Sequence, residues 1–168
     1  MKKAGCVFIN FGLESGSEKI LFLNQKNIRI SVIEETVAAC QKEGLAIGCF
    51  KLLGLSGETR ETFVETLQFM LKNKIFIPYP FPIVKPLPYP GTILHSLAEK
   101  QFRTTITWAN CYRYAGKVGT KFFQEVSMAE IQRLAYQYRL KQESRLLNKH
   151  YLKLLSRELL EKITKFLH

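Results

Sequence analysis

Residues 7–17 read VFINFGLESGS, and residues 48–59 read GCFKLLGLSGET. Each stretch passes from an apolar run of strand type into a turn of Gly, Ser and Glu, and then into a helical pattern. A repeat of strand, turn and helix favours a parallel sheet. Because open α/β folds bind ligands at the carboxyl ends of their strands, we expect both turns to border a binding site.

The surrounding sequence predicts further elements of the same kind. Strands are expected over residues 5–11, as a buried strand, and over residues 46–53. Helices are expected over 17–25, from Ser31 to Gly44, from Thr59 through the apolar positions Phe63, Leu67, Met70 and Leu71, from Thr92, from Ser127 to about Leu147, and from about Lys149 to Leu167. The pairs Ser31–Glu34 and Ser127–Glu130 have the spacing of capping boxes.

All six prolines lie between residues 78 and 90, and each is at an even position. In an extended chain, successive N–H groups alternate between the two sides, so every missing donor faces the same side. Such a strand can pair on one side only, and we expect it to be the edge strand that ends the strand order. The even spacing also excludes a P-x-x-P ligand for SH3 domains.

The cysteines, histidines and acidic residues limit which metal sites and catalytic groups the chain can form. Cys6, Cys40, Cys49 and Cys111 are too far apart for a local zinc or iron–sulfur motif, and we interpret them as reduced thiols in or near the core. The histidines make no metal-binding pattern, so we assign no metal ligand and no catalytic residue. All 14 acidic residues are glutamate, which argues against Asp-centred magnesium sites and Ser-His-Asp triads.

The formal net charge is +11, and 11 of the 25 Lys and Arg residues lie in residues 117–168, against five Glu. A basic face of this kind can contact nucleic acid or an acidic partner, and the alternatives are a solvated helical face or a surface that covers a missing domain. Without a signal peptide or an apolar run of membrane-spanning length, we expect a cytoplasmic protein with no membrane span. The amphipathic tail leaves binding to a membrane surface open.

The two turns hold the candidate binding residues. Glu14 and Glu58 stand at or just beyond strand ends, where a carboxylate can accept hydrogen bonds from ribose hydroxyls or a ligand amine. Neither stretch matches the dinucleotide, P-loop or hydrolase-elbow patterns. Close backbone approach to a ligand is permitted by the turn glycines Gly12, Gly16, Gly54 and Gly57.

Together with PYPGT at residues 88–92, these turns resemble the radical SAM superfamily, in particular the branch that often carries an upstream cobalamin-binding domain. Residues 2–17 resemble the family's fourth barrel strand, which approaches the ribose and methionyl group of S-adenosylmethionine (SAM). Residues 52–59 resemble the fifth-strand motif that packs against adenine, with Ser56 where proline is usual. The PYPGT stretch resembles the turn after the sixth strand. The aromatic segment that follows in this branch is similar to Trp108, Tyr112 and Tyr114.

This resemblance implies an α/β fold, namely the C-terminal half of a partial (β/α)6 TIM-like barrel with parallel strands and a helical extension. The expected parts are a half-barrel of about three βα units over residues 1–101, an irregular aromatic-rich connection over 102–126, and the extension over 127–168. The resemblance also implies a partial SAM site, formed by Glu14, Ser15, Leu52, Gly54 and Glu58.

The family's cysteine loop, C-x-x-x-C-x-x-C, holds a [4Fe-4S] cluster and does not occur in these 168 residues. The resemblance places that loop and the first three strands upstream, so we expect the chain to begin inside a barrel. The complete enzyme would cleave SAM reductively at the cluster and start radical chemistry on an unknown substrate, whereas this chain alone should be inactive. A separate N-terminal half with the cluster is the expected partner, and a full-length relative can also carry cobalamin.

Two other functions stay open on the sequence. The basic tail would also suit an RNA- or protein-binding module without catalysis, whose expected signature is a strongly salt-dependent affinity. Alternatively, a half-barrel with an exposed sheet edge would be a non-functional remnant that aggregates readily.

Overall fold

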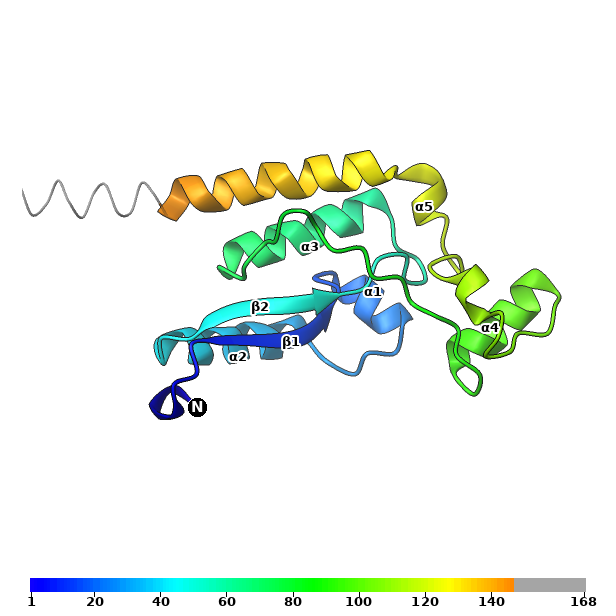
Figure 1. Cartoon of the computed structure of the whole chain (residues 1–168), viewed down its shortest axis with the longest axis horizontal. Helices are drawn as coiled ribbons and strands as arrows, with labels where there is room; N and C mark the ends of the chain where they lie inside the picture. Colours follow the sequence, from blue (N-terminus) through cyan, green and yellow to red (C-terminus); the bar gives the residue numbers. More distant parts are fainter. Residues whose placement is uncertain (147–168) are drawn as a thin grey trace, which may run out of the picture.

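The computed structural model describes residues 1–146 (Figure 1). In chain order its elements are η1 (Lys2–Ala4), β1 (Phe8–Glu14), α1 (Glu18–Leu23), α2 (Ile30–Lys42), β2 (Ala46–Lys51), α3 (Arg60–Lys72), α4 (Ile93–Phe102), η2 (Cys111–Tyr114) and α5 (Phe122–Glu125). A further helix occupies residues 128–146 and is drawn in yellow and orange in Figure 1. The helix expected from Lys149 to Leu167 lies outside the described residues.

β1 and β2 form a parallel two-stranded sheet. Phe8 pairs with Ala46, and the register shifts after Gly12, so that Glu14 lies opposite Lys51. Both strands point toward the end of the molecule where α1 and α4 lie (Figure 1). The predicted α/β class with parallel strands is therefore confirmed for these two strands, while the extent of a barrel stays a prediction.

Within residues 1–146, the other elements cover only one face of the sheet, and this corrects the prediction of a buried strand over residues 5–11. The strand runs from residue 8 to 14, and its burial alternates, with Leu13 as its one fully buried residue. Leu13 and Ile47 belong to the core that also contains residues of α2 and α3. The other face is open, because Phe8 is 43% and Phe50 64% exposed. An apolar run predicted the strand, but it did not show that only one face is covered.

The helices are where the sequence places them, although their caps differ. α2 begins at Ile30 after Arg29, with no side-chain cap, so the capping box at Ser31 is wrong. Ser127 does cap the 128–146 helix, since its Oγ accepts a hydrogen bond from the Glu130 N–H at 3.1 Å. The Glu130 carboxylate pairs with Arg60 instead, at 2.6 Å from its Nε.

The proline-rich segment is extended but forms no strand, so the prediction of an edge strand is wrong. Its even-numbered side faces β2, where the Phe76 N–H donates to the Ile47 carbonyl and the Val84 carbonyl accepts from the Leu53 N–H, each at 2.8 Å. Between these two contacts, Pro78, Pro80 and Pro82 have no N–H to donate. A continuous ladder to β2 therefore cannot form.

Two glutamines of the 128–146 helix satisfy the other side of this segment. The Gln132 side chain accepts from the Phe81 N–H and donates to the Phe81 carbonyl, both at 2.8 Å. Gln142 repeats this pattern, with the Ile77 N–H at 3.1 Å and the Ile75 carbonyl at 2.8 Å. Each side-chain amide thus makes the pair of hydrogen bonds that a neighbouring strand would make. We call these two contacts the glutamine clamp.

The segment after the prolines builds a smaller unit around α4. Ala98, Ile106, Cys111 and Val118 form a hydrophobic cluster separate from the main core. Residues 102–126 are largely irregular and contain η2 and the single turn α5. Across residues 1–146, no helix is both long enough and apolar enough to cross a bilayer.

Candidate functional site

The site is built where the two strands end. Glu14 closes β1 with a positive φ of 62°, a backbone conformation that turns the chain sharply. Its carbonyl accepts a hydrogen bond from the Leu52 N–H at 3.1 Å. Glu14 and Leu52, two of the predicted site residues, are therefore held side by side at the carboxyl edge of the sheet.

The Glu14 carboxylate lies over the open face of the sheet. A Cβ added to Gly12 would lie 3.4 Å from Glu14 Oε1, so the carboxylate folds back over this glycine. Lys26 Nζ is 3.6 Å from the same oxygen, and the Glu14 side chain stays 24% exposed. A partly exposed carboxylate with one cationic neighbour retains free acceptor positions, which a ligand hydroxyl or amine can use.

Ser15 is also at this edge, but its hydroxyl points into the protein. The side chain is buried, and its Oγ lies 3.3 Å from Thr66 Oγ1 and accepts from the Ser17 N–H at 3.2 Å. The next residue, Gly16, donates its N–H to Thr66 Oγ1 at 2.9 Å. Ser15 therefore ties the first turn to α3.

Glu58, in the second turn, uses its carboxylate inside its own loop. Glu58 Oε2 accepts from the Gly54 N–H and from the Leu55 N–H, the latter at 3.2 Å. The residue is only 4% exposed. Burial raises the pKa of Glu58 to about 7, although the two backbone donors act to lower it.

Gly54 is required by its surroundings. Its φ is 84°, and an added Cβ would lie 2.6 Å from the Phe123 ring and 2.9 Å from the Gly116 backbone. The second turn is therefore packed against α5 and the segment that precedes it. Gly54 and Glu58 shape this turn, and of the five predicted residues Glu14 alone presents a partly exposed charged group.

Asn24 joins the two turns and was missed by sequence reasoning. Its Nδ2 donates to the Ser56 carbonyl at 3.0 Å, and its Oδ1 accepts from the Ser56 N–H at 3.1 Å. Asn24 follows α1 directly, so a polar residue at the end of that helix was the available signal. The bridge fixes the second turn relative to the helix that follows the first.

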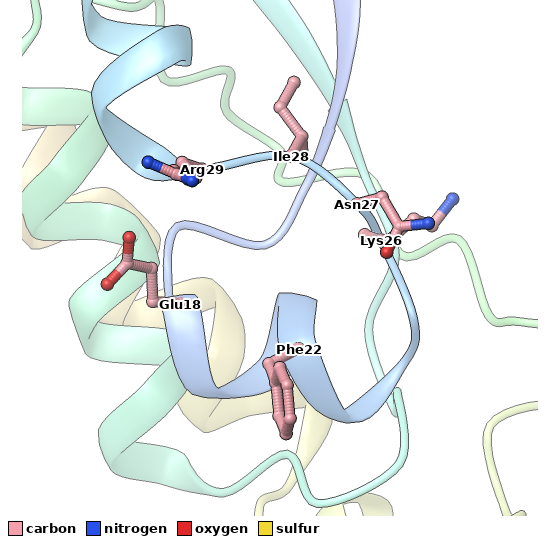
Figure 2. A pocket seen from close by; sticks show the side chains of 6 residues that line it. All are labelled: Glu18, Phe22, Lys26, Asn27, Ile28 and Arg29. Carbon is pink, nitrogen blue, oxygen red and sulfur yellow. The ribbon is translucent and has the colours of Figure 1, made fainter.

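A hollow of about 410 Å³ adjoins the first turn. Figure 2 shows it between α1 and the loop that leads to α2, with Glu18 and Arg29 on one side and Lys26 and Asn27 on the other. Phe22 and Ile28 complete the lining. None of the predicted site residues lines this hollow, but Lys26 connects it to Glu14.

Comparison with known proteins identifies the family of this architecture. Residues 1–70 match the model of the radical SAM superfamily. This stretch of 70 residues belongs to the radical SAM superfamily. The matched residues contain β1, α1, α2, β2 and most of α3, and thus both turns of the candidate site.

Relatives of this radical SAM chain include three methyltransferases. An uncharacterized methyltransferase of Pyrococcus horikoshii is 33% identical over 139 residues, which cover 81% of the chain and 29% of the relative. The bacteriochlorophyllide d C-8(2)-methyltransferase of Chlorobaculum tepidum is 35% identical over 112 residues, with 62% and 23% covered. The C-12(1)-methyltransferase of the same organism is 29% identical over 92 residues, with 54% and 19% covered. The chain thus spans less than a third of these relatives.

Superfamily membership implies SAM and a [4Fe-4S] cluster, and the residues suit the two cofactors differently. The open sheet face beside Glu14 suits a ligand with hydroxyl and amine donors. The four cysteines do not suit a cluster, because Cys49 lies in the main core and Cys111 in the α4 cluster. Within residues 1–146, no three His, Cys or acidic side chains converge as a metal site would require.

Lys51 is a second residue of this radical SAM chain that sequence reasoning missed. It lies opposite Glu14 at the end of β2, yet its side chain is buried on the core face. Its Nζ donates to the Cys49 carbonyl at 3.2 Å and lies 4.6 Å from the centroid of the Phe81 ring. Burial lowers the pKa of Lys51. Its alternation with Ile47 and Cys49 along the strand was the available signal.

Proposed function

We propose that this chain forms part of the SAM-binding surface of a methyltransferase of the radical SAM superfamily. The observation that carries the proposal is the Glu14 carboxylate, which lies over the open sheet face at the carboxyl edge of two parallel strands. Superfamily membership supports SAM as the ligand, and the names of three relatives support methyl transfer as the reaction class.

Each candidate residue has a separate role in this proposal. Glu14 accepts hydrogen bonds from the ribose hydroxyls or the amino group of SAM, and Leu52 offers an apolar contact to the adenine ring. Gly54 and Glu58 hold the second turn in the shape that presents Leu52. Ser15 fixes the first turn on α3. SAM itself supplies the methyl group or, after one-electron reduction, the 5′-deoxyadenosyl radical.

We further propose that the cluster resides in another polypeptide segment that completes the sheet. Two features support this. In the described part of the chain, β1 has a neighbour on one edge only, and Phe8 and Phe50 are exposed on the open face. The chain alone would then bind SAM weakly and would not cleave it. Two relatives are named for acting on bacteriochlorophyllide d, so we propose a tetrapyrrole as the substrate class of the complete enzyme.

Equilibrium dialysis of SAM against the purified chain tests the role of Glu14. Replacing Glu14 by Gln should weaken binding about tenfold, because hydrogen bonds to a charged acceptor contribute roughly 1.5–3 kcal/mol. Glu18→Gln is the matched control, since Glu18 lies four residues further on, on the adjoining hollow, and should leave binding unchanged. Equal SAM affinity of the wild type and Glu14→Gln would refute the assignment.

The RNA- or protein-binding alternative stays a prediction. Two cations of the 128–146 helix are engaged within the protein, because Arg133 lies 3.8 Å from Glu130 and Arg139 lies 2.6 Å from Glu143. We therefore rank the RNA- or protein-binding function below the SAM-binding function.

A further inference from the structure

An exposed aromatic pair lies beside α4, outside the site described above. The rings of Tyr89 and Trp108 are 5.5 Å apart between centroids and inclined by 33°. Trp108 is 69% and Tyr89 44% exposed. Contiguous exposed apolar surface of this kind commonly marks a contact surface.

The backbone under both rings is well fixed. The Tyr89 carbonyl accepts from the Thr92 N–H at 3.1 Å and from Thr92 Oγ1 at 2.7 Å, at the N-cap of α4. The carbonyl of Thr107, just before Trp108, accepts from the Asn110 and Cys111 N–H groups at 3.2 and 2.9 Å. Rings anchored in this way lose little conformational entropy when a ligand stacks on them.

The unit that carries the pair is strongly basic. Residues 85–121 contain six Lys or Arg and a single acidic residue, Glu99. The Glu99 carboxylate is used internally, since it accepts from the Ile106 N–H at 2.8 Å and lies 3.5 Å from His95 Nε2. Arg113 lies in η2, five residues after Trp108 in the sequence, with its guanidinium 5.9 Å from the ring centroid of Tyr112. The surroundings of the pair therefore favour an anionic ligand.

We propose that Tyr89 and Trp108 form a stacking surface for a flat conjugated ring system with carboxylates, a tetrapyrrole, and that Arg113 binds one carboxylate. The proposal rests on the proposed function, because it assigns a surface to that substrate class. The position supports it, since α4 lies beyond the carboxyl ends of β1 and β2 (Figure 1). One pair of rings matches a single macrocycle better than a nucleic-acid strand, which requires successive stacking positions.

Trp108 is the single tryptophan of the chain and therefore reports directly on this surface. The experiment titrates the full chain with a metal-free dicarboxylic porphyrin. The shift of the porphyrin Soret band gives the affinity, and protection of Trp108 fluorescence from acrylamide gives the location. Trp108→Ala and Tyr89→Ala should each weaken binding about tenfold, the usual effect of losing one stacked ring. Trp108→Phe, which keeps a stacking ring, should retain most of the affinity.

Two controls test the specificity of the surface. Phe22→Ala removes an aromatic ring that is 83% exposed on α1 and should leave porphyrin affinity unchanged. Arg113→Gln should weaken the binding of the dicarboxylic porphyrin and leave the binding of a neutral porphyrin of the same ring size unchanged.

Four results would overturn the proposal. The first is a wild-type chain that binds no porphyrin, and the second is an unchanged porphyrin affinity in Trp108→Ala and Tyr89→Ala. The third is a loss of porphyrin affinity in Phe22→Ala equal to that in Trp108→Ala. The fourth is displacement of the porphyrin by a single-stranded oligonucleotide at a concentration below that of the porphyrin. SAM dialysis with the Glu14 variant is independent of this surface. A failure here is thereby distinguished from a failure of the proposed function.

Discussion

The turns after β1 and β2 contain the same residue types, but they use their glutamates in opposite ways. Glu14 precedes its turn and leaves its carboxylate partly exposed over the open sheet face, 3.6 Å from Lys26. Glu58 follows its turn and places a buried carboxylate on the N–H groups of Gly54 and Leu55. The first turn presents a carboxylate to a ligand, and the second consumes its carboxylate in holding its own shape.

The position of the glutamate relative to the glycines accounts for this difference. A side chain that follows a turn can reach back to N–H groups three or four residues earlier, as the Glu or Gln of a capping box reaches back to the N-cap N–H. Glu58 stands directly before Thr59, the N-cap of α3, and meets this condition. Glu14 is the last residue of its strand and has no turn behind it. The residue composition of the two turns therefore predicts that both can bind a ligand. The order of glutamate and glycine along the chain predicts that the first turn does so.

The largest expected effect concerns how closely the first turn packs on α3. A Cβ on Gly16, in the first turn, would lie 2.8 Å from Thr66 Cα and 2.9 Å from Phe69 Cβ, so α3 would have to shift. Gly16→Ala should lower the free energy of unfolding by about 3 kcal/mol, measured by urea denaturation. Gly12→Ala is the control, because its Cβ meets the mobile Glu14 carboxylate at 3.4 Å. Similar losses in both variants would contradict the packing described for this turn.

The free energy of unfolding should depend on pH through Glu58 in the second turn. Its pKa is about 7 in the folded chain against 4.5 ordinarily, so the folded state holds this proton more tightly than the unfolded state. The resulting stabilisation is complete below pH 4.5 and is lost as pH rises through 7, by about 3 kcal/mol. Urea denaturation across this range should show the decline in the wild type and its absence in Glu58→Gln. An equal slope in Glu58→Gln would show that another group titrates.

The smallest effect concerns the glutamine clamp on the proline-rich segment. Gln132→Leu should cost about 1–2 kcal/mol of unfolding free energy, because it leaves the Phe81 N–H and carbonyl without partners. Gln137→Leu, at an exposed position of the same helix, should change stability by less than about 0.5 kcal/mol. If both variants melt alike, the glutamine clamp contributes nothing to stability.

Local pattern predicted the elements, but the sequence did not show which groups would satisfy each other over long distances. The apolar spacing of Phe63, Leu67 and Met70 correctly predicted the buried face of α3. The even spacing of the prolines predicted pairing through the odd-numbered side, whereas β2 lies against the even-numbered side. It predicted the wrong element, because the donors on the other side are bound by Gln132 and Gln142, more than fifty residues away in sequence.

The same limit applies to the candidate site. Sequence could place Glu14, Ser15 and Glu58 at strand ends, but could not show that Ser15 faces Thr66 or that Glu58 faces its own backbone. These outcomes depend on how α3 packs on the sheet. Their roles toward SAM stay predictions.

Chemical-shift mapping with SAM tests the contrast between the two turns most directly, and it detects even weak binding. In the amide spectrum of the labelled chain, SAM should shift the signals of Gly12, Glu14 and Leu52 in a saturable manner. The signals of Ser15 and Leu55, whose surroundings are internal, should move less. Saturable shifts centred on residues 54–58, with Gly12 and Glu14 unaffected, would contradict the account.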